Sequence, residues 1–215
     1  MDSQVVLVDS FCQAGKTKKS FETIQEMISD NPNCLILYIT QSNSTASANQ
    51  VIQRAQDTFK DLIPVSNIVN SGACLDLDIK KDQNYMIVDF WNSKKVGKIY
   101  NFVEKKIICF SKVILVMDEI DQGAKKGVKS RLEYILQIER VVNGIEENVE
   151  AAGFELPDIQ VVFLTATIAN LSKSISEIEN YKPELFINSK IAASIIKQTS
   201  VEHQFVQPSE SYAGI

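Results

Sequence analysis

The segment from Ser10 to Thr17, SFCQAGKT, combines residue types that bind phosphate groups. It follows the apolar run Val5–Val8 and leads into a helix-like stretch. In loops of the form GxxxxGK(S/T), backbone N–H groups surround a polyphosphate, the lysine reaches its terminal phosphates, and the Ser or Thr hydroxyl holds Mg²⁺. The segment therefore predicts a site for ATP or another nucleoside triphosphate, together with Mg²⁺.

The fit to this form is complete at the end of the loop and incomplete at its start. A serine, Ser10, stands where the form has its first glycine. The backbone there must therefore have dihedral angles that serine can adopt. Replacing glycines by Gln and Ala stiffens the loop but leaves its N–H groups available. The residues expected to bind the nucleotide are Ser10, Gln13, Ala14, Gly15, Lys16, Thr17 and Lys18.

A second segment, VILVMDEID, places two adjacent acids directly after an apolar run, Val113–Met117. The run is typical of a buried parallel strand, and ligands of open α/β sheets bind at the carboxyl ends of such strands. We expect Asp118 to hold Mg²⁺ through water and Glu119 to polarise the attacking water, with Lys16 as the other catalytic residue. The alternative is that both acids are a solvated strand end.

Strand-like and helix-like runs alternate along the chain, which predicts an α/β fold with a mostly parallel sheet and helices on both faces. Expected strands are Val5–Val8, Leu35–Ile39, Tyr85–Asp89, Val113–Met117 and Ile159–Leu164, with weaker signals near Asn67–Val69, Glu184–Ile187 and His203–Val206. Expected helices are Lys16–Ile28, Ala46–Phe59, Lys94–Glu104, Val128–Ala152 and Ile191–Lys197. Apolar residues at three- and four-residue steps make the Val128–Ala152 helix the clearest of them.

Composition narrows the class of protein. The 215 residues are 45% hydrophobic and 23% charged, enough for one well-buried domain and short for two. The net charge of −5 does not favour general binding to polyanions, although a local groove can still contact nucleic acid. Four scattered cysteines without a CxxC pair, and the absence of a long apolar run or signal peptide, predict an intracellular, reducing location away from the membrane.

The basic and aromatic residues allow two interpretations. Lysines gather at Lys94, Lys95 and Lys98 and again after the DEID segment, and we favour solvated helix faces over a nucleic-acid surface. Phe90 and Trp91 follow an expected strand, where an aromatic ring can stack on a base. Packing within the domain is the favoured alternative for both rings.

The motifs together resemble those of superfamily-two DEAD/DEAH-like helicases. SFCQAGKT is similar to motif I, LILYITQSN to motif Ia, DEID to the DExD/DExH box, and VVFLTATIAN to the Ser-Ala-Thr motif, all in the family's order. The glutamine before AGKT and the run MIVDFWNSKK most resemble helicases of large DNA viruses. The resemblance covers the first 170 residues and implies a RecA-like P-loop domain. It also implies an ATP-driven helicase or translocase acting on DNA or RNA.

The resemblance also implies further roles for individual residues. Asp121, Thr165 and Thr167 would couple nucleotide state to the rest of the protein, the threonines standing on a strand end beside the acids. Their alternative role is that of ordinary strand-end threonines. Gln41, Ser42 and Asn43 would contact the nucleic-acid backbone. A helix cap and turn before Ala46 explains these three residues equally well.

Helicases of this family are two-lobe machines whose second lobe supplies arginine fingers, and the chain shows no second strand–helix series after Ile187. We therefore expect residues 1–200 to form the first, ATP-binding lobe, and 201–215 to lead towards a second lobe missing from this chain. Alone, the lobe should bind nucleotide weakly. Two alternatives remain: the ATPase lobe of a nuclease or restriction-like machine, and a nucleotide-gated binding module without motor activity.

Overall fold

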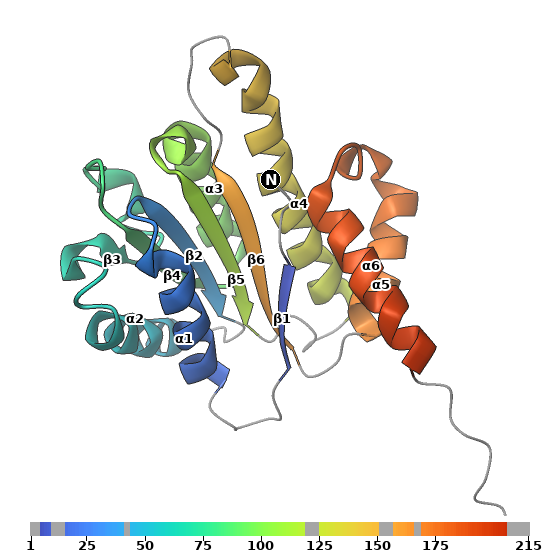
Figure 1. Ribbon diagram of the computed structural model, residues 1–215, viewed down its shortest axis with the longest axis horizontal. Helices are drawn as coiled ribbons and strands as arrows, with labels where there is room; N and C mark the ends of the chain where they lie inside the picture. Colours follow the sequence, from blue (N-terminus) through green and yellow to red (C-terminus); the bar gives the residue numbers. More distant parts are fainter. Residues whose placement is uncertain are drawn as a thin grey trace, which may run out of the picture.

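The computed structural model describes residues 5–9, 16–40, 44–118, 125–150, 157–165 and 169–205. Within these ranges the chain forms one six-stranded sheet, in which every strand pair is parallel, with helices on both faces (Figure 1). The predicted α/β class, a RecA-like P-loop domain with a mostly parallel sheet, is therefore confirmed by the architecture.

The strands form where the sequence carries runs of β-branched and aromatic residues. They are β1 Val5–Asp9, β2 Cys34–Thr40, β3 Ile68–Val69, β4 Tyr85–Phe90, β5 Lys112–Asp118 and β6 Asp158–Thr165. Their order across the sheet is β1-β6-β5-β2-β4-β3. Because helices cover both faces, the central strands are apolar along their length, and all seven residues of β2 are buried.

The helices fall close to the expected ranges, with one addition. They are α1 Lys16–Ser29, α2 Thr45–Thr58, α3 Ser93–Lys106, α4 Lys125–Glu150, α5 Ala169–Tyr181 and α6 Lys190–Phe205. Short 3-10 turns occur at Val65–Asn67, Cys74–Asp76, Ile107–Cys109 and Pro183–Leu185. Helix α5 was not expected, although Leu171, Ile175 and Ile178 recur at helical spacing and are buried.

One face of the sheet is covered by α1 and α2. Phe21 of α1 makes an edge contact with Tyr38 of β2 at 5.9 Å between ring centroids, and a tilted contact with Phe59 after α2 at 5.0 Å. Ile24 and Ala55 are fully buried in the same cluster. Aromatic packing thus fixes the start of α1 against the middle of the sheet.

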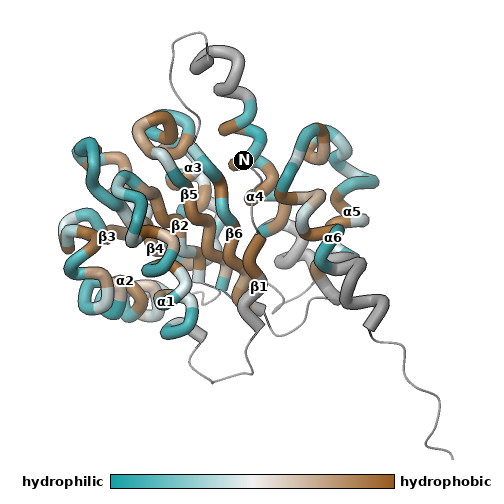
Figure 2. The backbone as a smooth tube through the Cα atoms, in the orientation of Figure 1, coloured by the Kyte–Doolittle hydropathy of each residue, from teal (hydrophilic) through white to brown (hydrophobic). Residues whose placement is uncertain are grey.

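The other face is covered by α3, α4, α5 and α6, whose buried apolar residues form one continuous cluster with β1, β2, β4, β5 and β6. The apolar stripe expected on α4 is buried at Leu132, Ile135, Ile138 and Val142. Figure 2 shows the resulting pattern, with hydrophobic strands in the middle and hydrophilic residues on the outer helical surfaces.

Two expected strands near the C-terminal end are wrong. Residues Glu184–Ile187 lie in a 3-10 turn and the turn after it, because Pro183 opens the turn and only Leu185 is fully inserted in the core. Ile187 is 72% exposed, so no alternating buried face exists for a strand. Of the other segment, His203–Val206, the residues up to Phe205 continue α6.

Helix α6 covers the outer edge of β1, which has a strand neighbour on one side only. The Gln198 side-chain amide donates a hydrogen bond to the backbone carbonyl of Val5, at 2.7 Å. Side chains of the same helix contact β1 from within the shared core. Covering an edge in this way satisfies polar groups that another chain would otherwise pair with. The helix also runs through position 200, where we expected the lobe to end.

Two further observations concern location. Within the described ranges, no helix is both long and apolar enough to cross a bilayer. Cys34 and Cys74 are free thiols in the core, and burial raises the pKa of the Cys34 thiol to about 11. Cys109 is exposed, because Ile107 and Phe110 on either side of it occupy the buried positions.

Candidate nucleotide site at the carboxyl edge of the sheet

The ends of β1, β6 and β5 meet at one edge of the sheet because the three strands are parallel neighbours. Asp9, the last residue of β1, lies opposite Thr165, the last residue of β6. Asp118, the last residue of β5, lies opposite Leu164. Two strand spacings, about 10 Å, separate the backbones of β1 and β5. The strands that carry the phosphate-loop, TAT and DEID motifs therefore end side by side, with the TAT strand in the middle.

Helix α1 begins at this same edge, shortly after the end of β1. Its first turn contains Lys16, Thr17 and Lys18, and the helix contacts both β1 and β6. The buried Ser20 hydroxyl donates a hydrogen bond to the Thr17 carbonyl at 2.8 Å and lies 3.4 Å from the Tyr38 hydroxyl. The first N–H groups of a helix lack intrahelical partners and attract anions. The helix start is thus oriented as a phosphate site requires.

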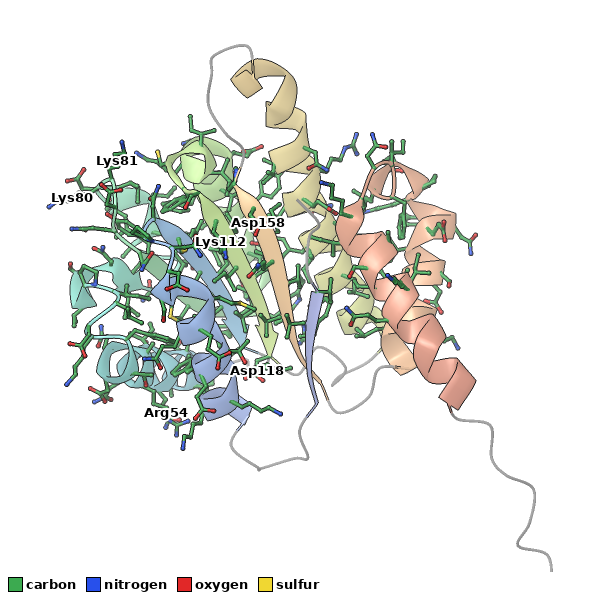
Figure 3. The ribbon with its side chains drawn as sticks, viewed as in Figure 1. Arg54, Lys80, Lys81, Lys112, Asp118 and Asp158 are labelled. Carbon is green, nitrogen blue, oxygen red and sulfur yellow. The ribbon has the colours of Figure 1, made fainter. Side chains whose placement is uncertain are left out.

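The oxygen donors at this edge suit Mg²⁺. Asp118 is half-buried at the end of β5, and Figure 3 shows it at the opposite end of the sheet from Lys112 and Asp158. Thr17, also half-buried, supplies a hydroxyl from the first turn of α1. Mg²⁺ takes oxygen ligands, keeps several waters and is commonly shared with nucleotide phosphates. A carboxylate at the end of β5 and a hydroxyl at the start of α1 are ligands of the kind that Mg²⁺ takes.

Several residues of the expected site lie outside the described ranges. These are Ser10, Gln13, Ala14, Gly15, Gln41, Ser42, Asn43, Glu119, Asp121 and Thr167. For Lys16 and Thr165 the structure describes the backbone position, at the start of α1 and the end of β6. Lys18 is exposed and forms an ion pair with Glu22 at 3.8 Å on the outer surface of α1.

The beginning of α2 bears on the interpretation of Gln41, Ser42 and Asn43. Ser44 is the N-cap, and its side chain accepts a hydrogen bond from the Ser47 N–H at 3.4 Å. The capping role is therefore filled by the residue after these three. That these three residues contact the sugar–phosphate backbone of a nucleic acid remains a prediction.

Sequence reasoning missed the enclosed carboxylate of Asp89 near the end of β4. One of its oxygens accepts the Ser71 hydroxyl at 2.5 Å and the Ser71 N–H at 3.3 Å. The other accepts the Phe90 N–H at 2.8 Å and the Lys95 ammonium at 2.6 Å. The side chain of Asp89 is 1% exposed. It ties the segment after β3, the end of β4 and the first turns of α3 together.

For two residues near Asp89 in the chain, Lys95 and Trp91, the sequence predicted a particular environment. Lys95, expected on a solvated helix face, instead pairs with Asp89 and lies 4.2 Å from the Phe90 ring centroid. Trp91 packs partly in the domain, the alternative we favoured: its ring meets Tyr134 at 5.7 Å, and the Arg131 guanidinium lies 5.9 Å from its centroid. The residue remains half-exposed. The acid inside the apolar run MIVDF, Asp89, was the feature of the sequence that could have indicated the contact with Lys95.

A second enclosed acid, Glu139 of α4, fixes the start of α6. Its carboxylate accepts the Ser189 hydroxyl at 2.5 Å and the N–H groups of Lys190 and Ile191 at 2.9 and 3.0 Å. Burial raises the pKa of Glu139, and these hydrogen bonds partly oppose the increase. A carboxylate at a helix N-terminus is favourable because it satisfies unpaired N–H groups. This acid is structural and lies away from the carboxyl edge of the sheet.

Comparison with known proteins adds little. No family model matches the chain, and a search of curated proteins finds no significant match. Among solved structures, a neighbour described as "Crystal structure of LAO/AO transport system kinase" is 12% identical, over 95% of this chain and 67% of that chain, with a TM-score of 0.19. A score this low carries no argument, so the fold assignment depends on strand order and register.

Proposed function

We propose that this chain binds and hydrolyses ATP with Mg²⁺ as the first lobe of a nucleic-acid helicase or translocase. One observation carries the proposal: β6 lies between β1 and β5, so the strands bearing the three motifs end at one edge, beside the start of α1. Four motifs in one order, three of them on adjacent strand ends, favour a nucleoside triphosphatase over a solvated sheet edge.

The start of α1 would bind the phosphates. Unpaired N–H groups of its first turn and the positive end of its dipole favour a polyanion there. Lys16 would neutralise the terminal phosphates, and the Thr17 hydroxyl would contribute a ligand to Mg²⁺. Phe21 and Ser20 hold this turn against β2, which limits the reorganisation that binding would otherwise require.

The end of β5 would supply the acids. Asp118 would orient Mg²⁺ through water, and Glu119 would accept a hydrogen bond from the attacking water. Bound Mg²⁺–ATP supplies the phosphoryl group and the charge that these residues stabilise. Hydrolysis by the lobe alone should be slow, because arginines from a second lobe are expected to complete the site.

Strand β6, which lies between the strands of the phosphate-loop and DEID motifs, offers a route that couples nucleotide state to the rest of the protein. A change at Asp118 would reach Thr165 across one strand spacing, since Asp118 lies opposite the residue before Thr165. Thr167 and Asp121 would transmit the change to nucleic acid and to the second lobe. This role separates a motor from a module that merely binds nucleotide.

The proposal can be tested with Lys16→Ala and a matched control, Lys19→Ala, which removes an exposed lysine from the same helix. Binding of a fluorescent ATP analogue and phosphate release would be measured with and without single-stranded DNA or RNA. We expect Lys16→Ala to lower turnover by about 100-fold or more, as removal of a transition-state charge contact does, and Lys19→Ala to change it little.

Turnover of Lys16→Ala within a few-fold of the parent chain would refute the phosphate site. Stimulation of turnover by nucleic acid would support a motor lobe. Bound ATP with turnover indifferent to every nucleic acid would instead favour the nucleotide-gated module.

A further inference from the structure

An open hollow of about 600 Å³ lies between α3 and α4. Its lining includes Trp91, the residue directly after β4, so the hollow opens near the sheet edge at which Asp118 ends β5. Only β2 separates β4 from β5 in the sheet. The volume falls within the range of pockets that bind small molecules or parts of larger ones.

Aromatic rings form the wall of this hollow. Trp91, Tyr100 and Tyr134 all line it. Trp91 and Tyr100 are half-buried, so each ring keeps surface open to the solvent. The edge contact between Trp91 and Tyr134 fixes the orientation of the indole. Flat, fixed aromatic surfaces of this kind bind nucleobases by stacking, with little dependence on base identity.

Two lysines lie at the rim. Lys94 and Lys98 stand one helical turn apart on α3, both are exposed, and neither has an ion-pair partner among the described residues. The acid in the lining, Glu133, is paired with Lys182 at 3.2 Å. The rim therefore carries positive charge that a phosphate group would neutralise, in a protein whose net charge is −5.

Gly97 stands at the rim, where an added Cβ would meet nothing within 4 Å. Glycine is less favourable than other residues in a helix interior, and at this position it adds no side chain to the mouth of the hollow.

The hollow continues along α4. A second one, of about 470 Å³, shares Tyr100 and Gln137 with the first and adds Arg140, Lys182 and the acid Glu184. The combined groove is longer than a mononucleotide needs. Its length favours a chain of nucleotides over a free nucleotide.

We propose that the α3–α4 hollow binds single-stranded nucleic acid, with one base against Trp91 and Tyr100 and the adjoining phosphates at Lys94 and Lys98. The inference builds on the proposed function by giving the nucleic acid a site on this lobe. Its test requires neither ATP nor Mg²⁺, so the two proposals can fail separately.

Trp91 is the chain's only tryptophan, so its fluorescence reports directly on the hollow. The 215-residue chain would be titrated with single-stranded oligothymidylate of eight nucleotides, an abasic oligomer of equal length and charge, and AMP. We expect saturable quenching by the oligothymidylate, and binding weaker by about tenfold or more for the abasic oligomer and for AMP. Lys16→Ala should leave the quenching unchanged.

Variants locate the contacts. The double substitution Lys94→Ala/Lys98→Ala should weaken binding about tenfold and reduce its salt dependence. Tyr100→Ala should weaken it about tenfold by removing one of the aromatic surfaces against which the base stacks. Gly97→Leu should block the mouth. Lys105→Ala, which removes an exposed lysine from the last turn of α3, is the matched control and should bind like the parent chain.

Binding without quenching would overturn the proposal, because the strand would then lie elsewhere. Equal quenching by AMP would also overturn it and would indicate a site for free nucleotides. Unchanged affinity of either Tyr100→Ala or the double lysine variant would exclude the base or the phosphate contact, respectively. Circular dichroism of each variant separates these results from unfolding.

Discussion

Two acids near the carboxyl edge of the sheet, Asp118 and Asp89, differ in what surrounds them. Asp118 ends β5, at the edge of the sheet where α1 begins, and is half-buried. Asp89 lies two strands away near the end of β4, is fully buried, and has both oxygens occupied by Ser71, Phe90 and Lys95. The enclosed acid holds neighbouring segments together, whereas the half-buried acid keeps part of its surface accessible to a ligand.

The difference teaches that a carboxylate near a strand end does not by itself indicate chemistry. An acid whose oxygens all have protein donors contributes to folding, and its removal should be felt in stability. A half-buried acid at the edge of the sheet should contribute less to folding, and its removal should be felt mainly in activity. Substitutions at the two positions should therefore have opposite signatures.

The largest effect is expected for Asp118→Asn on ATP turnover. Loss of the carboxylate would weaken the hold on Mg²⁺, and we expect turnover to fall by about 1,000-fold, with a nearly unchanged unfolding midpoint. Phosphate release and urea denaturation would be measured on the same samples. Asp158→Asn, at the amino edge of the sheet (Figure 3), is the control and should preserve both properties. Retained turnover in Asp118→Asn would remove the contrast with Asp89.

Next in size is Asp89→Ala, which should lower the free energy of unfolding by about 3 kcal/mol, because it leaves the Lys95 ammonium and three other donors without their acceptor. Chemical denaturation at neutral pH would measure the loss. The affinity of the folded fraction for ATP should change less than twofold. Asp76→Ala removes an exposed acid nearby and serves as the control. A midpoint equal to that of the parent chain would show that the enclosed acid is dispensable.

Glu139 sharpens the comparison because it is an enclosed acid that caps a helix. Because the pKa of Glu139 is raised in the folded protein, ionisation of this side chain opposes folding. The contribution of the protonated side chain to stability is full below the unfolded pKa of about 4.5 and is lost as the pH rises through the folded pKa. Glu139→Gln keeps acceptor and donor positions without the charge. We therefore expect the stability of the parent chain, relative to Glu139→Gln, to fall between pH 4 and 8 in urea titrations. A constant difference would contradict the raised pKa.

The smallest effect is expected for Glu22→Ala. Its carboxylate faces Lys18 at 3.8 Å, with 84% of the lysine side chain and 58% of the glutamate side chain exposed. Solvent screens such a pair, so the melting temperature should not shift measurably. Differential scanning fluorimetry would detect a shift of a degree or more. A shift of that size would contradict the view that enclosure of an acid determines how much it contributes to stability.

Local patterns in the sequence predicted most of the fold. The apolar runs that became β2 and β5 are buried on both faces, and the stripe that became the middle of α4 is spaced for a helix. Near the C-terminal end the patterns misled, because the short apolar run at Glu184–Ile187 resembles a strand until the effect of Pro183 is considered.

The enclosed acids could not be predicted, because their partners are distant in sequence. Ser71 lies 18 residues from Asp89, and Ser189 lies 50 residues from Glu139. Strand order is equally non-local, and only the family resemblance suggested that the TAT strand stands beside the DEID strand. In the expected nucleotide site, sequence identified the motifs and the structure places Thr17, Asp118 and the end of β6 at one edge.

The position of β1 has a consequence for biosynthesis. Its strand neighbour is β6, and Val5 pairs with Val161, so β1 finds its partner only about 150 residues later in the chain. At about 5–20 residues per second, roughly 10–30 seconds pass before β6 leaves the ribosome. Strands β2, β4 and β5 can associate during that interval. The segment that leads into the phosphate loop therefore docks later than these strands, and a nascent chain can gain its nucleotide site only after β6 has been made.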